Sequence, residues 1–142
     1  MDLPELNEEN CKPGDKLRPY SVTYDEPFVA AFLERTGESP ADYEGPDGRV
    51  VPPAVFFSAY GRLIHGTYHY ETGVFVTSNL RLFKAPPLGT KALVTGEVLR
   101  LFERNDNKYV TFSVVVSDES SGERFAEVEH TSIYKLKPRP AR

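Results

Sequence analysis

The chain has 142 residues, enough for one domain with a substantial hydrophobic core, and its formal net charge of −4 argues against a nucleic-acid surface. Its single cysteine, Cys11, excludes an internal disulfide and a cysteine-rich zinc site, and we expect no metal. No apolar run approaches the roughly 18 residues of a membrane span, and the acidic, polar N-terminus is unlike a signal peptide. We therefore expect a cytoplasmic protein.

The first regular elements are a short strand and a helix. The alternating β-forming residues Tyr20–Tyr24 predict the strand. Asp25 is placed to cap a helix over Glu26–Thr36, and Gly37 is a natural residue to end it. Residues 38–49 are rich in proline, glycine and acidic residues, which indicates a loop.

The apolar stretch Val50–Ile64, VVPPAVFFSAYGRLI, predicts the central element of the fold. A residue that precedes a proline avoids the α region, so we expect Pro52 to be extended and Pro53 to take the first helical position. Apolar residues cover nearly every side of the helix from there to about Tyr68, which is typical of a buried helix. The two prolines thus fix where this helix begins.

Strand patterns dominate the rest of the chain. The predicted strands, separated by turn residues, are Val74–Thr77 with Leu80–Phe83, then Ala92–Phe102, Tyr109–Ser117 and Phe125–Leu136. Alternate residues of the last strands are apolar, which predicts an antiparallel meander with one buried face. The only apolar helix available to cover that face is the one that begins at Pro53.

The economical architecture is an α+β hotdog fold, in which a curved antiparallel sheet wraps around one long central helix. We expect one such domain over residues 20–136, after an irregular lead-in over residues 1–19 and before a tail over residues 137–142. The outer face and the edges of such a sheet often pair with a second copy, so a dimer is expected.

Over roughly residues 20–136 the sequence resembles the MaoC-like hotdog family of R-specific enoyl-CoA hydratases and dehydratases. The resemblance rests on three segments in the family's order: YSVTYDEPFVAAFLERTGESP, VVPPAVFFSAYGRLI and LRLFKAPPLGTKALVTGEV. It implies an acyl thioester of CoA or of a carrier protein as the ligand, with no further cofactor. In active members of the family, an Asp and a His a few residues apart act as base and acid on water. The first free N–H of the central helix polarises the thioester carbonyl.

The acid–base pair of the family is incomplete in this sequence. The family's Gly-Asp matches Gly37-Glu38, but no histidine follows before His65. Glu38 can stand in for the Asp, and Asp42 or Tyr43 lies near the position where the His belongs. We therefore name Glu38 and Asp42 as the candidate catalytic residues, while a carboxylate without a His partner makes a weak hydratase.

The start of the central helix also departs from the family pattern. The His-Gly pair that opens the family's helix is replaced by Pro52-Pro53, and proline has no N–H to donate. The carbonyl donor would then be the amide of Ala54 or Val55, because the first N–H groups of a helix lack internal partners. With Phe56 and Tyr60, these residues are the candidate substrate-binding positions.

Three functions fit these observations. The first is a hydratase- or dehydratase-type protein with an incomplete dyad, which resembles the non-catalytic half of two-part hydratases. In such assemblies one hotdog domain holds the acyl chain and its partner supplies the chemistry. The second is a hotdog acyl-CoA thioesterase that uses Glu38 or Asp42 as a general base. The third is a non-enzymatic binding or scaffold subunit of a hydratase complex. A homodimer and a heteromer with a second hotdog subunit both remain open.

The histidines and the nearby basic residues have simpler interpretations. His65 and His69, spaced i, i+4, lie near the C-terminal end of the helix, where a dipole or dimer contact is favoured over a metal or base role. His130 falls on the apolar face of the last strand and is expected to be a hydrogen-bonded core residue. Arg81 or Lys84 could meet a CoA phosphate, although surface charge on a strand is the commoner explanation.

Overall fold

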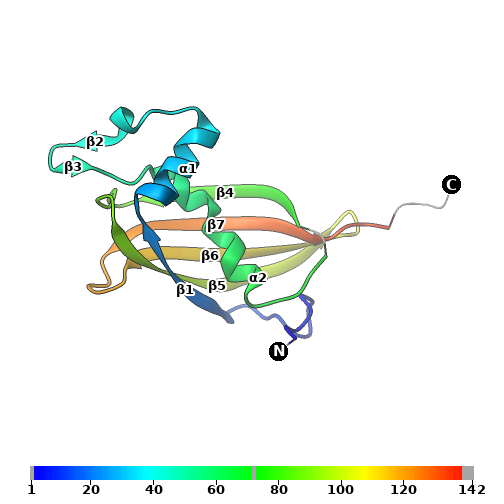
Figure 1. Ribbon diagram of the computed structural model, residues 1–142. Coiled ribbons are helices and arrows are strands. Elements are labelled where there is room, and N and C mark those ends of the chain that lie inside the picture. The colour runs from blue at the N-terminus through cyan, green and yellow to red at the C-terminus, as the bar shows by residue number, and fades with distance from the viewer. Residues whose placement is uncertain (1, 72, 139–142) are drawn as a thin grey trace.

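The computed structural model describes residues 2–71 and 73–138. A five-stranded antiparallel sheet with the strand order β1-β5-β6-β7-β4 forms its main layer (Figure 1). Its strands are β1 (Lys16–Tyr24), β4 (Val74–Leu82), β5 (Thr90–Arg104), β6 (Asn107–Asp118) and β7 (Arg124–Lys135). The last three strands are neighbours in the sheet, which confirms the predicted meander.

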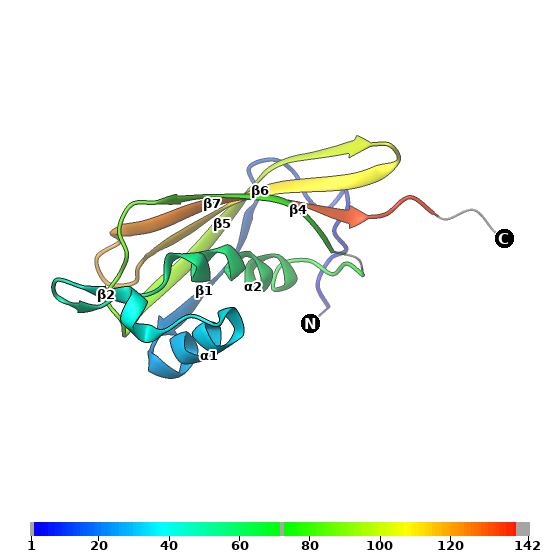
Figure 2. The ribbon, with the colours of Figure 1, turned by 90° about the horizontal axis from the view of Figure 1, so that it is seen from above.

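The predicted helix after the first strand is confirmed as α1 (Glu26–Thr36). The side chain of Asp25 caps it by accepting a hydrogen bond from the Phe28 N–H at 3.1 Å. Gly37 ends it in the left-handed region with a φ of 72°, a conformation that glycine adopts without a Cβ penalty. Figure 2 shows α1 on the same side of the sheet as the central helix, but further from the sheet.

The central helix has two parts, a 3₁₀ segment η2 (Pro53–Ser58) and an α-helix α2 (Tyr60–His65). The predicted start of the helix at Pro53 is confirmed, while the predicted end at about Tyr68 is wrong, because the helix ends at His65. The Val55 N–H reaches back three residues to the Pro52 carbonyl at 3.1 Å, the 3₁₀ pattern that is frequent at helix N-termini.

The end of α2 also has a local cause. The helix gives way at Gly66, a residue with low helix propensity. The Thr67 hydroxyl then donates to the Leu63 carbonyl at 2.7 Å, so a side chain competes for an acceptor of the last turn.

The sheet curves around this helix, and the core lies between the two layers (Figures 1 and 2). Leu63 of α2 is fully buried, as is Phe112 of β6, with an exposed fraction of 0% for each side chain. The predicted inward face of β6 is confirmed, since its alternate residues are buried: Val110, Phe112, Val114 and Val116. The structure is thus the expected α+β hotdog fold.

The first strand is longer than predicted and includes the end of the expected lead-in. β1 begins at Lys16 instead of Tyr20, and its register against β5 shifts between Leu17 and Tyr20. Pro19 lies in that irregular step. Proline interrupts a strand pattern in the sequence, but an edge strand tolerates it at a bulge because the missing N–H is not needed there.

The predicted loop over residues 38–49 contains small ordered elements: η1 (Pro40–Tyr43), β2 (Glu44–Gly45) and β3 (Gly48–Arg49). It projects away from the main sheet beside α1 (Figure 1). Of the predicted tail, residues 139–142 lie outside the described residues. None of the helices in the described part of the chain combines the length and apolar character that crossing a membrane requires.

Candidate functional site

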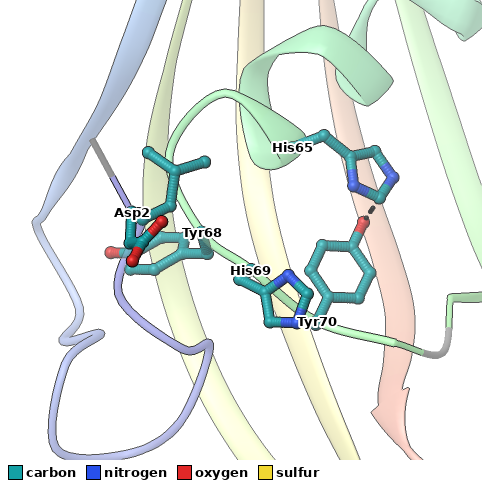
Figure 3. Close-up of a pocket in the computed structure, with 6 residues that line it drawn as sticks. Asp2, His65, Tyr68, His69 and Tyr70 are labelled. Atoms are coloured by element: carbon teal, nitrogen blue, oxygen red, sulfur yellow. Dashed lines mark hydrogen bonds between the residues drawn. The ribbon is translucent and has the colours of Figure 1, made fainter.

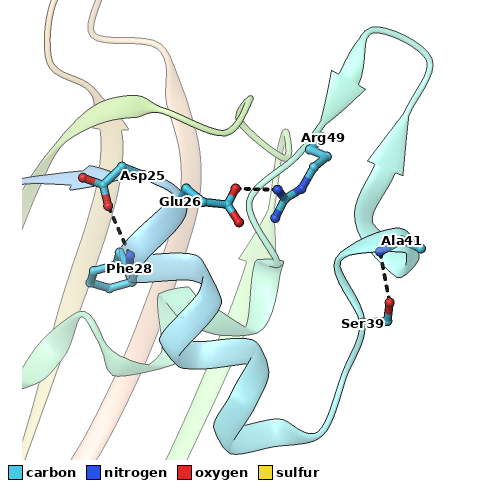
Figure 4. A network of polar contacts seen from close by, with 6 residues as sticks. All are labelled: Asp25, Glu26, Phe28, Ser39, Ala41 and Arg49. Atoms are coloured by element: carbon cyan, nitrogen blue, oxygen red, sulfur yellow. Dashed lines mark hydrogen bonds and ion pairs between the residues drawn. The ribbon is translucent and has the colours of Figure 1, made fainter.

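The two candidate catalytic acids both take part in hydrogen bonds within their own loop. Asp42 accepts from the Ser39 N–H at 3.1 Å. Ser39 Oγ accepts from the Ala41 N–H at 3.3 Å (Figure 4), and the side chains of Ser39 and Asp42 form a capping box at the start of η1. Glu38 accepts a hydrogen bond from the Tyr43 hydroxyl, and this bond raises the pKa of Tyr43. Both carboxylates are exposed.

The loop is fastened to the rest of the chain near the start of the central helix. Arg49 forms an ion pair with Glu26 in the first turn of α1 (Figure 4). The Val51 N–H donates to the Pro86 carbonyl at 2.8 Å, so the APPLG turn before β5 supports the segment that leads into the prolines. The positions of Glu38 and Asp42 relative to the helix are therefore set by α1 and by this turn.

The helix start leaves one backbone donor free. Pro53 has no N–H, and the Val55 N–H is used by the Pro52 carbonyl. Within the described residues, the Ala54 N–H makes no hydrogen bond, and Ala54 is exposed. Of the two amides considered from the sequence, Ala54 is thus the one able to donate to a ligand oxygen.

The other candidate substrate-binding residues are core residues in the isolated chain. The side chains of Val55 and Phe56 are 1% and 0% exposed, and the Phe56 ring packs edge-on against Tyr24 at 5.5 Å. Tyr60 is half-buried and stacks on the ring of His130 at a centroid distance of 3.7 Å. An acyl chain would reach Val55 and Phe56 only if the helix and the sheet moved apart.

The helix is not buried all round, contrary to the sequence expectation. Phe57 is 37% exposed, next to the exposed Ala54. The neighbouring strand β4, against which η2 packs, is an edge strand and exposes Val74, Phe75 and Val76 by 38%, 57% and 44%. An apolar surface therefore continues from the helix start to an open sheet edge.

His130 is a hydrogen-bonded core residue, as predicted. Its ring is 0% exposed, and its two nitrogens lie 2.5 Å from Ser78 Oγ and 2.6 Å from Ser132 Oγ. Burial lowers the pKa of His130 to about 4, so the imidazole is neutral at physiological pH. It packs between Tyr60 and Phe75 and has no carboxylate partner in the described residues, which makes it a structural group.

The pair His65 and His69 flanks a hollow of about 430 Å³ at the far end of the central helix (Figure 3). The His65 ring stacks on Tyr70 at 4.6 Å, and its Nε2 lies 3.2 Å from the Tyr70 hydroxyl. Burial raises the pKa of Tyr70 to about 12. Residues 2–71 and 73–138 contain no cluster of three or more His, Cys, Asp or Glu side chains placed to hold a metal.

Sequence reasoning missed several residues that shape this region. Gly96 of β5 allows the close approach of Leu63. In the sequence it is one residue of the TGEV segment, and nothing there indicates a contact with the helix. Ser78 and Ser132 hydrogen-bond the two nitrogens of His130. Ser132 lies two residues away on the same strand, whereas the place of Ser78 becomes visible only once β4 and β7 are paired. The run VFVTSNLRL reads as an ordinary strand, and no local signal tells that it lies at the edge.

No protein-family profile and no curated protein sequence matches the chain. Solved structures do match it. An unliganded R-hydratase from Pseudomonas aeruginosa superposes with a TM-score of 0.74 at 15% identity, over 99% of this chain and 97% of that chain. A MaoC-like dehydratase from Rhodospirillum rubrum gives a TM-score of 0.70 at 15% identity, over 94% and 99% of the two chains.

A third similar structure is an assembly of different subunits. It is a 3R-hydroxyacyl-ACP dehydratase complex from Mycobacterium tuberculosis, with a TM-score of 0.68 and 17% identity over 85% of this chain and 96% of that chain. These likenesses extend over at least 85% of each chain and confirm the hotdog fold of MaoC-like dehydratases and R-hydratases that was expected from the sequence.

Proposed function

We propose that the protein is a MaoC-type hotdog subunit that binds an acyl thioester and depends on a second hotdog subunit for acid–base chemistry. The observation that carries this proposal is the start of the central helix. There the exposed Ala54 offers a free N–H, while no histidine precedes His65 in the sequence. The chain thus retains a means to bind the carbonyl and lacks the usual means to move a proton.

The Ala54 amide would bind the thioester carbonyl oxygen in the position that an oxyanion donor takes. An N–H aimed at the oxygen stabilises the charge that develops there when water adds to the double bond or leaves. Pro53 supports this role because it sets the backbone of the first turn, and it removes a competing donor one residue earlier. Acyl-chain length and carrier type are outside this proposal.

The surface around this amide supports a partner subunit. An open edge strand with exposed apolar side chains is a template for pairing with another chain, and β4 has only Arg81 as a charged residue to oppose such pairing. We place the second hotdog subunit along β4, where it would cover Phe57 and Phe75. The similarity to a heteromeric dehydratase complex favours a different subunit over a second copy as the source of the missing acid–base pair.

The thioesterase alternative finds less support. It needs Glu38 or Asp42 as a general base, and both carboxylates already accept hydrogen bonds from their own loop. A base in such a role must lie within hydrogen-bond reach of a water that also meets the substrate carbonyl. Neither acid shares a hydrogen bond with the residues at the helix start.

The test combines an assay and a measurement of assembly. The purified chain is mixed with a short trans-2-enoyl-CoA, and both hydration and release of free CoA are followed. We expect neither reaction from the chain alone, and hydration after addition of a hotdog subunit that has an intact Asp and His pair. Light scattering of the mixture should show a complex, and Phe75→Asp should weaken it. Rapid hydration by the isolated chain would reject the proposal.

A further inference from the structure

A hollow of about 410 Å³ lies at the far end of the sheet, where the N-terminal lead-in passes the end of β7. Its apolar and aromatic walls come from three segments of the chain: Leu6, Tyr70, Tyr134 and Leu136. Tyr70 and His69 also line the hollow of Figure 3. None of the residues that line this space takes part in the function proposed above.

The lead-in forms a fixed wall of the hollow. The Leu6 N–H donates to the His69 carbonyl at 2.9 Å, and the His69 N–H donates to the Pro4 carbonyl at 2.8 Å. The Leu6 side chain is 3% exposed, so it is anchored in the core. A chain end that is tied down in this way does not fray, and it can hold one side of a binding site.

The hollow is also lined by a buried tyrosine whose hydroxyl lacks a protein partner. Tyr134 is 5% exposed, and among residues 2–71 and 73–138 no group hydrogen-bonds its hydroxyl. Every fully buried side-chain nitrogen or oxygen atom in the same residues has a partner, so this hydroxyl keeps access to solvent. Burial raises the pKa of Tyr134 to about 12, and the neutral hydroxyl can accept a hydrogen bond from a ligand in the hollow.

The charged side chains around the hollow favour a cation. Glu5 and Glu71 are exposed, and within the described part of the chain neither lies at ion-pair distance from a basic side chain. Among the residues that line the hollow, Lys135 is the only lysine or arginine, so the carboxylates outnumber it. The net charge of −4 on the whole chain acts in the same direction.

The Tyr70 ring adds an attraction that is specific to cations. The ring is held by stacking on His65, with 4.6 Å between the ring centroids. An aromatic ring attracts a cation because its face carries partial negative charge. Carboxylates, an aromatic ring and a hydroxyl acceptor together suit a protonated amine, which donates hydrogen bonds and accepts none. The apolar walls suit a hydrocarbon body attached to it.

We propose that this hollow binds a small alkylamine in its protonated form. The ammonium group pairs with the carboxylates of Glu5 and Glu71 and donates to the Tyr134 hydroxyl, while the hydrocarbon lies against Leu6 and Leu136. The site is separate from the start of the central helix, so it goes beyond the proposed function and does not depend on it. An anionic ligand would pair with Lys135, and the experiment distinguishes the two signs of charge.

The experiment uses three probes of one shape, n-hexylamine, n-hexanol and n-hexanoate, which are cationic, neutral and anionic at neutral pH. Titration calorimetry measures the affinity, and an NMR titration of the isotope-labelled chain locates the site. We expect hexylamine to bind at millimolar concentration, at least about tenfold more tightly than hexanol, because only the cation gains from the carboxylates and the ring. The amide signals that move should belong to residues 5–6, 69–71 and 134–136.

Substitutions test each group separately. Glu5→Gln and Glu71→Gln should each weaken hexylamine binding by about two- to fivefold, the range of an exposed ion pair. Tyr134→Phe removes only the hydroxyl and should weaken it by at least about twofold. Glu9→Gln is the matched control, because it makes the same charge change in the same lead-in but lies outside the lining. Thermal unfolding of each variant checks that it is folded.

The amine site is rejected if hexanol or hexanoate binds as tightly as hexylamine, or if hexylamine does not bind at millimolar concentration. It is also rejected if Glu9→Gln weakens binding as much as Glu71→Gln, because the net charge alone would then explain the affinity. Signal shifts confined to other segments of the chain would place the amine elsewhere and overturn the assignment to this hollow.

Discussion

Leu63 of the central helix packs directly onto Gly96 of β5, and the contact leaves no room for a side chain on the strand. A Cβ at position 96 would lie 3.0 Å from Leu63 Cδ1 and 2.9 Å from the Ser113 carbonyl oxygen. The glycine therefore sets how closely the helix approaches the sheet.

We expect Gly96→Ala to lower the free energy of unfolding by about 1–3 kcal/mol, because the strand backbone must shift to relieve the contact. Urea denaturation measures the change. Gly61→Ala is the control: it lies in α2 with open space around its Cβ position, and it should be neutral or stabilise by up to about 1 kcal/mol. Equal effects of the two variants would contradict this account of the helix contact.

The burial of His130 predicts a loss of stability in mild acid. Its pKa is about 4 in the folded chain, against an ordinary value of 6.5, because burial disfavours the charged ring. Above pH 6.5 both states leave the ring neutral, so stability is fully present. As the pH falls toward 4 only the unfolded state takes up the proton, and roughly 3 kcal/mol of stability is lost.

Urea denaturation between pH 7 and pH 4 tests this effect. His130→Gln keeps an amide that can hydrogen-bond Ser78 or Ser132 but does not titrate, so its stability should fall less steeply over this range. His69→Gln, the same change at an exposed position, is the matched control. If the native chain and His130→Gln have the same slope, the buried ring does not control acid stability.

The sequence predicted the helix, strand and meander well where the pattern was local and periodic. The bounds of α1 follow from the Asp25 cap and Gly37, and the inward face of β6 follows from strict alternation. The central helix could not be predicted as well. Its division into a 3₁₀ segment and an α segment has no signal in the apolar pattern, and the Val51–Pro86 hydrogen bond that precedes it joins segments far apart in the sequence.

The candidate site shows the same division. The absence of a nearby histidine and the missing N–H of Pro53 are visible in the residues themselves. The Val55 N–H donates to the Pro52 carbonyl, while the Ala54 N–H stays free. This difference follows from the backbone geometry, which the sequence did not predict.

The capping box predicts that Asp42 supports the loop instead of catalysing a reaction. Asp42→Ala removes the acceptor of the Ser39 N–H, and we expect a cost of about 0.5–2 kcal/mol to the local structure, seen as faster proteolysis between residues 38 and 49. Acyl-CoA binding should change by less than about twofold. Glu38→Gln, which keeps a partner for Tyr43, should change neither quantity. If either variant lost catalysis while it remained folded, the replaced acid would be a general base and not only a support of the loop.

The free amide of Ala54 predicts a variant that is more stable and binds worse. Ala54→Glu puts a carboxylate in the first turn, where the positive end of the helix dipole stabilises it by about 0.3–1 kcal/mol. The new carboxylate also accepts the hydrogen bond of the free backbone N–H and repels the oxygen of the thioester carbonyl. Acyl-CoA binding should therefore fall at least tenfold. Ala30→Glu, an exposed change on α1, is the control and should leave binding intact. Unfolding curves and calorimetry with a non-hydrolysable acyl-CoA measure both effects. If Ala54→Glu binds as tightly as the native chain, the carbonyl does not lie at this amide.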